Sequence, residues 1–365
     1  MKINVTKDQL QEKVNLAARF ISHKLSSVVS LQGILLKSEA NKLHLYSTDL
    51  TSYIHTTLPI ESSESFQVIL EPKKILEFLQ FLNPGKIEIE IKEKQVTITQ
   101  DKTKGNFPLI AAGDFPLPPE MKEKAQKLEA KFFKKYLPLI LFATSTDETR
   151  PALTGVSFIT SDEELVMVAT DGFRLSLVKT KGEIDFPSML VPGEFLSEIL
   201  RFIKDEKEVF FTYSREEKMI QFTVGGTAFY SRLIEGEFPP YERVLPAESK
   251  TIITLDTDEF QRNIKLISVF ARDYSNVVVC EFKKDGLYVR PKKESNEDNS
   301  AFQEIQMTGE EQRIAFNYRF VLDLLNTIDS KSIRIEILRS DAPIVFRTEK
   351  GEQFLHIIMP VRIQE

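Results

Sequence analysis

Ala169-Thr170-Asp171-Gly172-Phe173-Arg174-Leu175 is the stretch of this chain that most constrains its fold. The apolar, β-branched run 165–168 precedes it, and residues 175–178 alternate apolar and polar side chains. Asp-Gly between two such runs is a strong hairpin signal, because both central residues of a type I′ turn need a positive φ. The stretch therefore predicts a β-hairpin with Asp171 and Gly172 at its tip.

The surroundings of this turn recur earlier in the chain. Residues 153–158 (Leu-Thr-Gly-Val-Ser-Phe) are similar to residues 31–36 (Leu-Gln-Gly-Ile-Leu-Leu). Thr170-Asp171 matches Thr48-Asp49, 122 residues earlier. The Thr-Asp corner thus belongs to a repeated scaffold, and Gly-Phe-Arg-Leu is what the second copy adds to it.

Further landmarks repeat at nearly the same distance. Residues 191–196 repeat the pattern of residues 71–76 after 120 residues. Glu237-Phe238-Pro239 repeats Asp114-Phe115-Pro116 after 123, and Met359-Pro360 follows Pro239 after 121. Chance similarity among ordinary hairpins does not readily produce matching offsets at separate landmarks. The chain therefore consists of three copies of about 120 residues, which we place at 1–120, 126–246 and 250–365.

Each copy has the pattern helix, strands, helix, strands. In the first copy, helical spacing of apolar residues runs to Ile21, and a second helix begins at Pro72 and stops at Asn83. In the third, helices are expected from about Asp258 and from about Asn317, the latter with Phe320 on its buried side. The fold class is α+β, with two helices of each domain packed on antiparallel sheets.

Composition is typical of a globular protein without a membrane span. The chain has 365 residues, 42% of them apolar and 28% charged, and a net charge of −6. No apolar run approaches the roughly 18 residues that span a bilayer, and the N-terminus lacks a signal-peptide core. The one cysteine, Cys280, lies in a β-like run and is expected to be a small buried residue. These features favour the cytoplasm, and the net charge argues against indiscriminate nucleic-acid binding.

With the repeats in place, the whole chain resembles the bacterial sliding clamps, the β subunits of DNA polymerase III. The resemblance is carried by the following stretches: residues 47–50 (Ser-Thr-Asp-Leu), 169–175, 236–244 (Gly-Glu-Phe-Pro-Pro-Tyr-Glu-Arg-Val), 316–317 (Phe-Asn) and 358–363 (Ile-Met-Pro-Val-Arg-Ile). It implies the DNA-clamp fold and a head-to-tail homodimer that closes into a six-domain ring. Such a ring encircles double-stranded DNA without regard to sequence. It tethers polymerase subunits, the clamp loader and other proteins that carry a clamp-binding motif.

A ring of this kind needs modest positive charge on the surface that faces DNA. Basic residues fall on the expected helices although the chain as a whole is acidic. The residues expected to face DNA are Lys13, Lys24, Lys73, Lys134, Lys135, Arg262 and Lys265. For each lysine taken singly, an ordinary solvated helix face is the favoured interpretation.

The resemblance also implies a groove for a short extended peptide between the second and third domains. The matching positions are Leu153, Thr170, Gly172, Phe173, Arg174, Leu175, Pro239, Arg243, Val244, Ile357, Met359, Pro360, Val361, Arg362 and Ile363. Aliphatic walls, an adaptable methionine and arginines at the rim suit such a site. The alternative is that Leu175, Val244 and Ile363 are plain core residues.

The dimer contact implied by the family joins the first domain of one subunit to the third domain of the other. It maps to Phe107 and Leu109 on one side and to Val269 and Phe270 on the other. All four are apolar, as such a contact requires.

The chain also departs from the family pattern. Phe173 stands where members often have histidine or another polar residue, and Gln364 and Glu365 extend past the groove. The acidic pair Asp147-Glu148 weakens DNA contact by the second domain, as Gly193-Glu194 does in place of a basic pair. Pro138 should kink or shorten its helix.

An enzyme is not expected. The four histidines lie on separate elements without metal-ligand spacing, and phosphate-loop, nucleophile-elbow and dinucleotide-binding motifs are absent from the sequence. No cofactor and no catalytic residue is assigned. A repeat-built scaffold that binds proteins but does not encircle DNA remains the alternative function.

Overall fold

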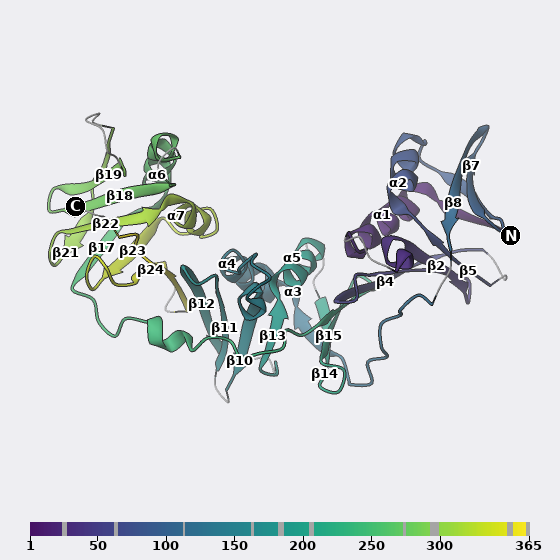
Figure 1. The fold of residues 1–365 in the computed structure, drawn as a ribbon, viewed down its shortest axis with the longest axis horizontal. Coiled ribbons are helices and arrows are strands. Elements are labelled where there is room, and N and C mark those ends of the chain that lie inside the picture. The colour runs from purple at the N-terminus through teal and green to yellow at the C-terminus, as the bar shows by residue number, and fades with distance from the viewer. Residues whose placement is uncertain are drawn as a thin grey trace. The chain divides into compact units, whose positions relative to one another are not determined.

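The structure, a computed structural model, describes residues 1–23, 28–61, 65–111, 114–161, 164–181, 186–203, 208–272, 275–292, 299–348 and 353–362. The chain forms two compact units. The first contains Met1–Ala130 and Arg201–Leu233, and the second contains Lys131–Leu200 and Ile234–Glu365. Figure 1 shows the ribbon with its elements labelled.

The first unit is built on one antiparallel sheet of twelve strands within the described residues. Its strand order is β1-β6-β7-β8-β5-β2-β3-β4-β16-β15-β14-β9. The bounds are β1 (Lys2–Thr6), β2 (Ile34–Glu39), β3 (Lys42–Thr48), β4 (Ser52–Pro59), β5 (Phe66–Leu70), β6 (Lys86–Ile91), β7 (Gln95–Gln100), β8 (Thr103–Ile110), β9 (Gln126–Glu129), β14 (Glu208–Ser214), β15 (Met219–Val224) and β16 (Thr227–Arg232). The pairing of β4 with β16 makes this sheet continuous between the first copy and part of the second.

Two helices of the first unit pack against each other, and α1 also contacts β3 and β4 (Figure 1). α1 (Lys7–Ala17) turns Leu10 and Val14 inward, and the 3₁₀ turns η1 (Ala18–Phe20) and η2 (Val29–Gln32) follow it. α2 (Pro72–Phe81) begins at Pro72, as predicted, because a proline at the first helical position has no hydrogen bond to lose. Both helices of the first copy thus lie where the sequence predicts them.

The second unit contains a nine-stranded and a four-stranded antiparallel sheet within its described part. Their orders are β13-β10-β11-β12-β25-β24-β23-β17-β21 and β20-β19-β18-β22. The bounds are β10 (Gly155–Thr160), β11 (Glu164–Thr170), β12 (Arg174–Lys181), β13 (Met189–Pro192), β17 (Thr251–Asp256), β18 (Val277–Lys283), β19 (Gly286–Pro291), β20 (Ala301–Gln303), β21 (Gln306–Thr308), β22 (Gln312–Asn317), β23 (Ser332–Ile337), β24 (Ile344–Thr348) and β25 (Phe354–Ile358).

The helices of the second unit have clear sequence determinants. The bounds are α3 (Ala130–Tyr136), α4 (Pro138–Leu141), α5 (Gly193–Phe202), α6 (Thr257–Ala271) and α7 (Tyr318–Leu325), with 3₁₀ turns η3 (Pro151–Thr154) and η4 (Tyr241–Val244). Pro138 separates α3 from α4, which confirms the predicted interruption. The Asp256 carboxylate caps α6 by accepting from the Glu259 N–H, and the Asn317 side chain caps α7 by accepting from the Arg319 N–H.

Cys280 lies in β18 and is fully buried, as predicted. Burial raises the pKa of its thiol to about 12. The thiol is therefore protonated and unreactive near neutral pH.

Candidate functional site: an apolar surface beside the 169–175 hairpin

The turn between β11 and β12 differs by one residue from the prediction. The Asp171 N–H donates to the Arg174 carbonyl oxygen at 3.3 Å, so Gly172 and Phe173 are the two central residues. Gly172 has a φ of +93°, whereas φ at Phe173 is negative. A positive φ at the first central residue favours glycine there. The predicted type I′ tip at Asp171 and Gly172 is therefore wrong, because Asp171 contributes through its side chain instead.

Thr170 and Asp171 hold this turn with their side chains. Thr170 Oγ1 donates to the Arg174 carbonyl at 2.6 Å and accepts from the Gly172 N–H at 3.1 Å. Asp171 Oδ1 accepts from the N–H groups of Phe173 and Arg174 at 2.8 and 3.0 Å. These bonds satisfy the backbone of the loop and fix the direction in which Phe173 and Arg174 leave it.

The first copy contains the same turn with different residues at its tip. Thr48 Oγ1 donates to the Ser52 carbonyl at 2.8 Å, and Asp49 Oδ1 accepts from the Thr51 and Ser52 N–H groups at 2.9 and 2.7 Å. Leu50 occupies the position of Gly172, with φ +77°. The Thr-Asp corner is thus scaffold in both copies, and the two copies differ in the side chains that follow it.

Arg174 connects the hairpin to α7. Its Nε lies 3.0 Å from Asp171 Oδ2, and its Nη1 lies 2.5 Å from Asp323 Oδ2. The guanidinium also lies over the rings of Phe142 and Phe320, 5.6 and 4.6 Å from the ring centroids. Its side chain is only 11% exposed. A guanidinium held by two carboxylates and two rings is a fixed part of the surface.

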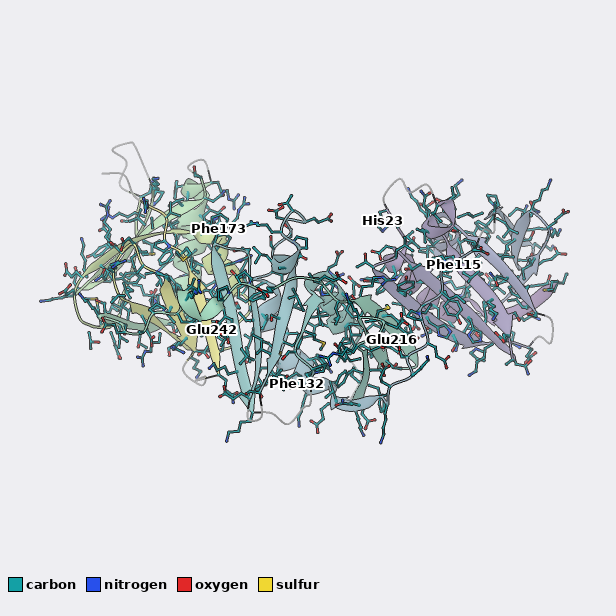
Figure 2. The ribbon with its side chains drawn as sticks, turned by 60° about the horizontal axis from the view of Figure 1, so that its bottom comes forward. His23, Phe115, Phe132, Phe173, Glu216 and Glu242 are labelled. Carbon is teal, nitrogen blue, oxygen red and sulfur yellow. The ribbon has the colours of Figure 1, made fainter. Side chains whose placement is uncertain are left out.

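Phe173 is the most exposed apolar side chain of this region. It is 59% exposed and stacks on Phe320 with the ring centroids 6.5 Å apart. Figure 2 labels it on the second unit. Its carbonyl oxygen accepts from the Met359 N–H at 2.8 Å, and Met359 is itself 37% exposed. Phe173, Phe320 and Met359 therefore form a patch that presents apolar area to solvent.

A buried apolar layer continues from this patch along the sheet. β12 pairs with β25 in the register Leu175 to Ile357. The buried members of the layer are Val166, Val168, Leu175, Leu177, Val345, Leu355 and Ile357. Ile159, Phe238, Tyr241 and Leu245 pack against them while staying partly exposed. The turn η4, on which Figure 2 labels Glu242, therefore forms one wall of this surface.

The predicted groove residues divide into a base and an exposed rim. Leu153, Leu175 and Ile357 are buried, so they can only form the base. Thr170, Arg174, Pro360 and Val361 are partly buried, and Gly172, Phe173, Pro239, Arg243, Val244, Met359 and Arg362 are exposed. Val244, at 38% exposure, is not a core residue in this chain. Ile363, Gln364 and Glu365 lie outside the described residues.

Several residues of this surface were missed by sequence reasoning. Phe142, Asp323 and Phe238 were not assigned to it, although each packs on or pairs with an assigned residue. Phe320, expected on the buried side of its helix, is partly exposed and stacks on Phe173. Asp323 and Phe320 are three positions apart on α7, a spacing that places both on one helix face.

His356 lies beneath the surface, on β25. It is fully buried, and its Nδ1 lies 2.7 Å from Ser176 Oγ. Its ring packs 5.0 Å from the ring of Phe142, measured between centroids. Burial, with a smaller effect of the Arg174 charge, lowers its pKa to about 3. The imidazole is therefore neutral near pH 7 and acts as a packing and hydrogen-bonding group.

The residues expected to face DNA all lie on helices where the structure describes them. Lys13 is on α1, Lys73 on α2, Lys134 and Lys135 on α3, and Arg262 and Lys265 on α6. Lys13 Nζ lies 3.1 Å from Glu12 Oε1, and Arg262 Nη2 lies 3.4 Å from Glu259 Oε1. Lys24 lies outside the described residues.

The residues assigned to the dimer contact differ in exposure. Phe107 is 7% exposed and its ring packs 5.5 Å from Phe78 within the first unit. On α6, Val269 and Phe270 are 58% and 39% exposed, and Leu266 beside them is 51% exposed. Leu266 was missed, although a spacing of three and four residues places it on the same helix face. Helix α6 therefore presents an apolar stripe to solvent in the single chain.

Two negative findings apply to the described part of the chain. It holds no group of three or more His, Cys, Asp or Glu side chains that could bind a metal ion. None of its helices is long and apolar enough to cross a membrane.

Repeated α+β units, continuous antiparallel sheets and an apolar surface beside the second-copy hairpin define the class of three-domain clamp proteins. Comparison with known families agrees: the DNA polymerase III beta subunit models match in order, the N-terminal domain at residues 1–119, the central domain at 127–240 and the C-terminal domain at 242–362. The chain belongs to the family of bacterial DNA polymerase III beta subunits, the beta sliding clamps.

Individual relatives span the whole chain. The beta sliding clamp of Bacillus subtilis is 28% identical over 380 residues, covering 99% of this chain and 100% of that protein. The crystal structure of the Bacillus subtilis DNA polymerase sliding clamp superposes with a TM-score of 0.90 at 27% identity, with full coverage of both chains. The beta subunit of DNA polymerase III from Thermotoga maritima gives a TM-score of 0.91 at 22% identity, also with full coverage of both chains. The predicted family and the three-domain clamp fold are thereby confirmed.

Proposed function

We propose that this protein is a DNA sliding clamp: two copies join head to tail into a six-domain ring that encircles double-stranded DNA and tethers replication and repair proteins to it. The observation that carries the proposal is the succession of all three clamp domains along one chain. A ring holds DNA by topology, so it needs no base contacts and no reaction of its own. We accordingly assign no catalytic role and place the protein in the cytoplasm, with the DNA it serves.

The helices α1, α2, α3 and α6 supply the charge that would face DNA. Lys73, Lys134, Lys135 and Lys265 are exposed. Asp8, Glu12 and Glu77 line a hollow between α1 and α2 and reduce the positive potential there. Weak, sequence-independent attraction of this kind keeps a ring mobile on the duplex.

The apolar surface around Phe173 and Met359 is the proposed binding site for partner peptides. It would receive a short extended segment of polymerase subunits, of the clamp loader and of other proteins that carry a clamp-binding motif. Burying one aliphatic and one aromatic anchor contributes roughly 1.5–3 kcal/mol each. Ordering a flexible peptide offsets part of this, so we expect an affinity of about micromolar.

The direct test is topological. A ring loaded by a bacterial clamp loader onto nicked circular DNA should stay bound through gel filtration at high salt and should dissociate once the DNA is cut. Equal retention on linear and circular DNA would refute encirclement. If the protein bound partner peptides but was retained on neither DNA, the result would support the alternative function, a protein-binding scaffold.

The DNA-facing helices are tested by charge reversal. Lys73→Glu, Lys134→Glu and Lys135→Glu together should reduce DNA-stimulated loading, because like charges repel the phosphates. Unchanged loading would remove these helices from the DNA-facing surface.

A further inference from the structure

The four-stranded sheet β20-β19-β18-β22 has one face covered by helices and a second face that is partly covered, by Val361 on Val277, Val279 and Ala315. α6 contacts β18 and β19, and α7 contacts β22 (Figure 1). Val278, Cys280 and Phe282 of β18 are fully buried. Side chains alternate along a strand, so their neighbours Val279, Glu281 and Lys283 lie on the other face. Charged residues gather on that face.

Four cations lie on this second face, and we call it the basic face: Lys283, Arg290, Lys292 and Arg313. Tyr288 pairs with Glu281 and Arg290 with Val279 in the β18–β19 register, and Arg313 pairs with Glu281 across β22. Directly paired residues share a face of the sheet. Lys292 comes two residues after Arg290 and therefore lies on the same face of the sheet. Its N–H donates to the Val277 carbonyl.

One carboxylate, Glu281, serves three of these cations. Its oxygens lie 3.3 Å from Lys283 Nζ, 3.5 Å from Arg313 Nε and 3.9 Å from Arg290 Nε. Its side chain is 19% exposed, whereas that of Arg313 is 57% exposed. Two more acids lie at this edge: Asp285 accepts a hydrogen bond from the Tyr288 hydroxyl at 2.7 Å, and Glu311 Oε1 accepts from the Lys284 N–H at 3.1 Å. Among the described residues, the four cations of the basic face outnumber its acids by one, on a chain whose net charge is −6.

The C-terminal segment joins the basic face to the proposed peptide site. Met359 N–H donates to the Phe173 carbonyl, and Val361 N–H donates to the Ala315 carbonyl at 2.8 Å. Val361 packs on Val277, Val279 and Ala315 of the same sheet face. Two residues of one segment, Met359 and Val361, thus contact the proposed peptide site and the basic face in turn.

We propose that the basic face binds acidic residues that flank the groove-bound segment of a partner protein. This inference rests on the proposed peptide site and adds the chemistry of the flanking sequence. Arginine pairs with carboxylates in two-point geometry, and Arg290 and Arg313, on the two strands that flank β18, can each hold a separate acidic side chain of an extended peptide. Adjacency to a peptide site favours a protein ligand over a nucleic acid. The pairs would be exposed, so they add affinity modestly and are weakened by salt.

The experiment uses the full chain and two fluorescein-labelled synthetic peptides, both with Leu and Phe anchors. One peptide has glutamates on both sides of the anchors and the other has serines there. The unmodified protein should bind the glutamate peptide about tenfold more tightly at low salt, with the preference lost at high salt. In the variant Arg290→Gln, Lys292→Gln and Arg313→Gln, both peptides should bind like the serine peptide.

A matched control removes the same charge from exposed lysines of the first unit, through Lys42→Gln, Lys86→Gln and Lys94→Gln. This control should keep the tenfold preference, and thermal melts check that both variants are folded. An equal preference in the wild type and the basic-face variant would overturn the inference while leaving the groove in place. Failure of both peptides to bind would refute the groove and the inference together. The wild type could instead bind a labelled oligo-dT and show no preference for the glutamate peptide. If the basic-face variant then failed to bind the oligo-dT, the face would be assigned to nucleic acid.

Discussion

His356 shows how one buried residue couples pH to stability. Its pKa falls from 6.5 in the unfolded chain to about 3 in the folded protein, because burial disfavours the imidazolium. The folded state therefore binds fewer protons than the unfolded state below pH 6.5. The stability that neutral His356 contributes is complete above pH 6.5 and is lost as the pH falls toward 3, by about 2 kcal/mol at pH 5.

The variant His356→Asn removes this titration. It should lower stability at pH 7.5, since it loses packing against Phe142, and it should reduce the dependence of stability on pH between 6.5 and 5. The remaining dependence belongs to His55, whose pKa burial lowers to about 4. Urea unfolding at several pH values measures the slope. A slope identical to that of the wild type would show that His356 is not the group responsible.

Gly172 and Leu50 occupy the same position of two copies of one turn, and they should respond differently to substitution. Gly172→Leu should lower the free energy of unfolding by about 1–2 kcal/mol, because φ +93° is unfavourable for a side chain with a Cβ. Leu50→Gly should be nearly neutral, since relief at φ +77° is offset by the entropy of glycine in the unfolded chain. Chemical denaturation of both variants tests this, and equal losses would contradict it.

At the residue scale, the sequence predicted the local role of a residue better than the side chains that it contacts in the fold. Thr-Asp as scaffold, buried Cys280 and the interruption at Pro138 follow from local chemistry, and the structure agrees. The contacts of Arg174 with Phe142, Phe320 and Asp323 do not, because they join side chains from three distant segments. The periodicity of a segment indicates which face of its helix or strand a side chain occupies. It does not indicate which distant segment packs against that face.

Between elements, the ion pair of Arg174 with Asp323 ties β12 to α7. Arg174→Met and Asp323→Asn should each destabilise the protein, and the double variant should lose less than the sum of the two. The coupling should be about 1 kcal/mol, because Asp323 is 44% exposed and solvent screens the pair. A double-mutant cycle in urea gives the value. Strict additivity would show that the two side chains do not stabilise each other.

The elements themselves were largely predictable, whereas their partners were not. Apolar periodicity, Pro72 and Asn317 place α2 and α7 correctly. The pairing of β12 with β25 joins residues about 180 positions apart, and that of β4 with β16 about as many. Neither pairing has a local signal, because strands of similar alternation can pair in many ways. The proposed peptide site depends on the first of these pairings, so only the family resemblance pointed to it.

For the whole molecule, the exposed stripe on α6 is the feature that a single chain does not explain. Leu266, Val269 and Phe270 present apolar area to water on one helix face, which is unfavourable unless another surface covers it. In the proposed ring that surface belongs to the first domain of a second copy, around Phe107 and Leu109. Phe107 is packed within its own unit, so its substitution would also disturb folding. Substitutions on the exposed face of α6 can disrupt assembly without disturbing the fold.

Val269→Glu with Phe270→Glu should therefore convert a dimer into a folded monomer, because two carboxylates cannot be buried unpaired in an apolar contact. Light scattering coupled to gel filtration at micromolar concentration measures the mass. Leu50→Glu with Leu117→Glu is the matched control: these side chains are 45% and 50% exposed and are not assigned to the contact, so this variant should remain a dimer. The monomeric variant should keep its melting behaviour and peptide binding and should lose retention on circular DNA. A dimer that survives both α6 substitutions would place the ring contact elsewhere.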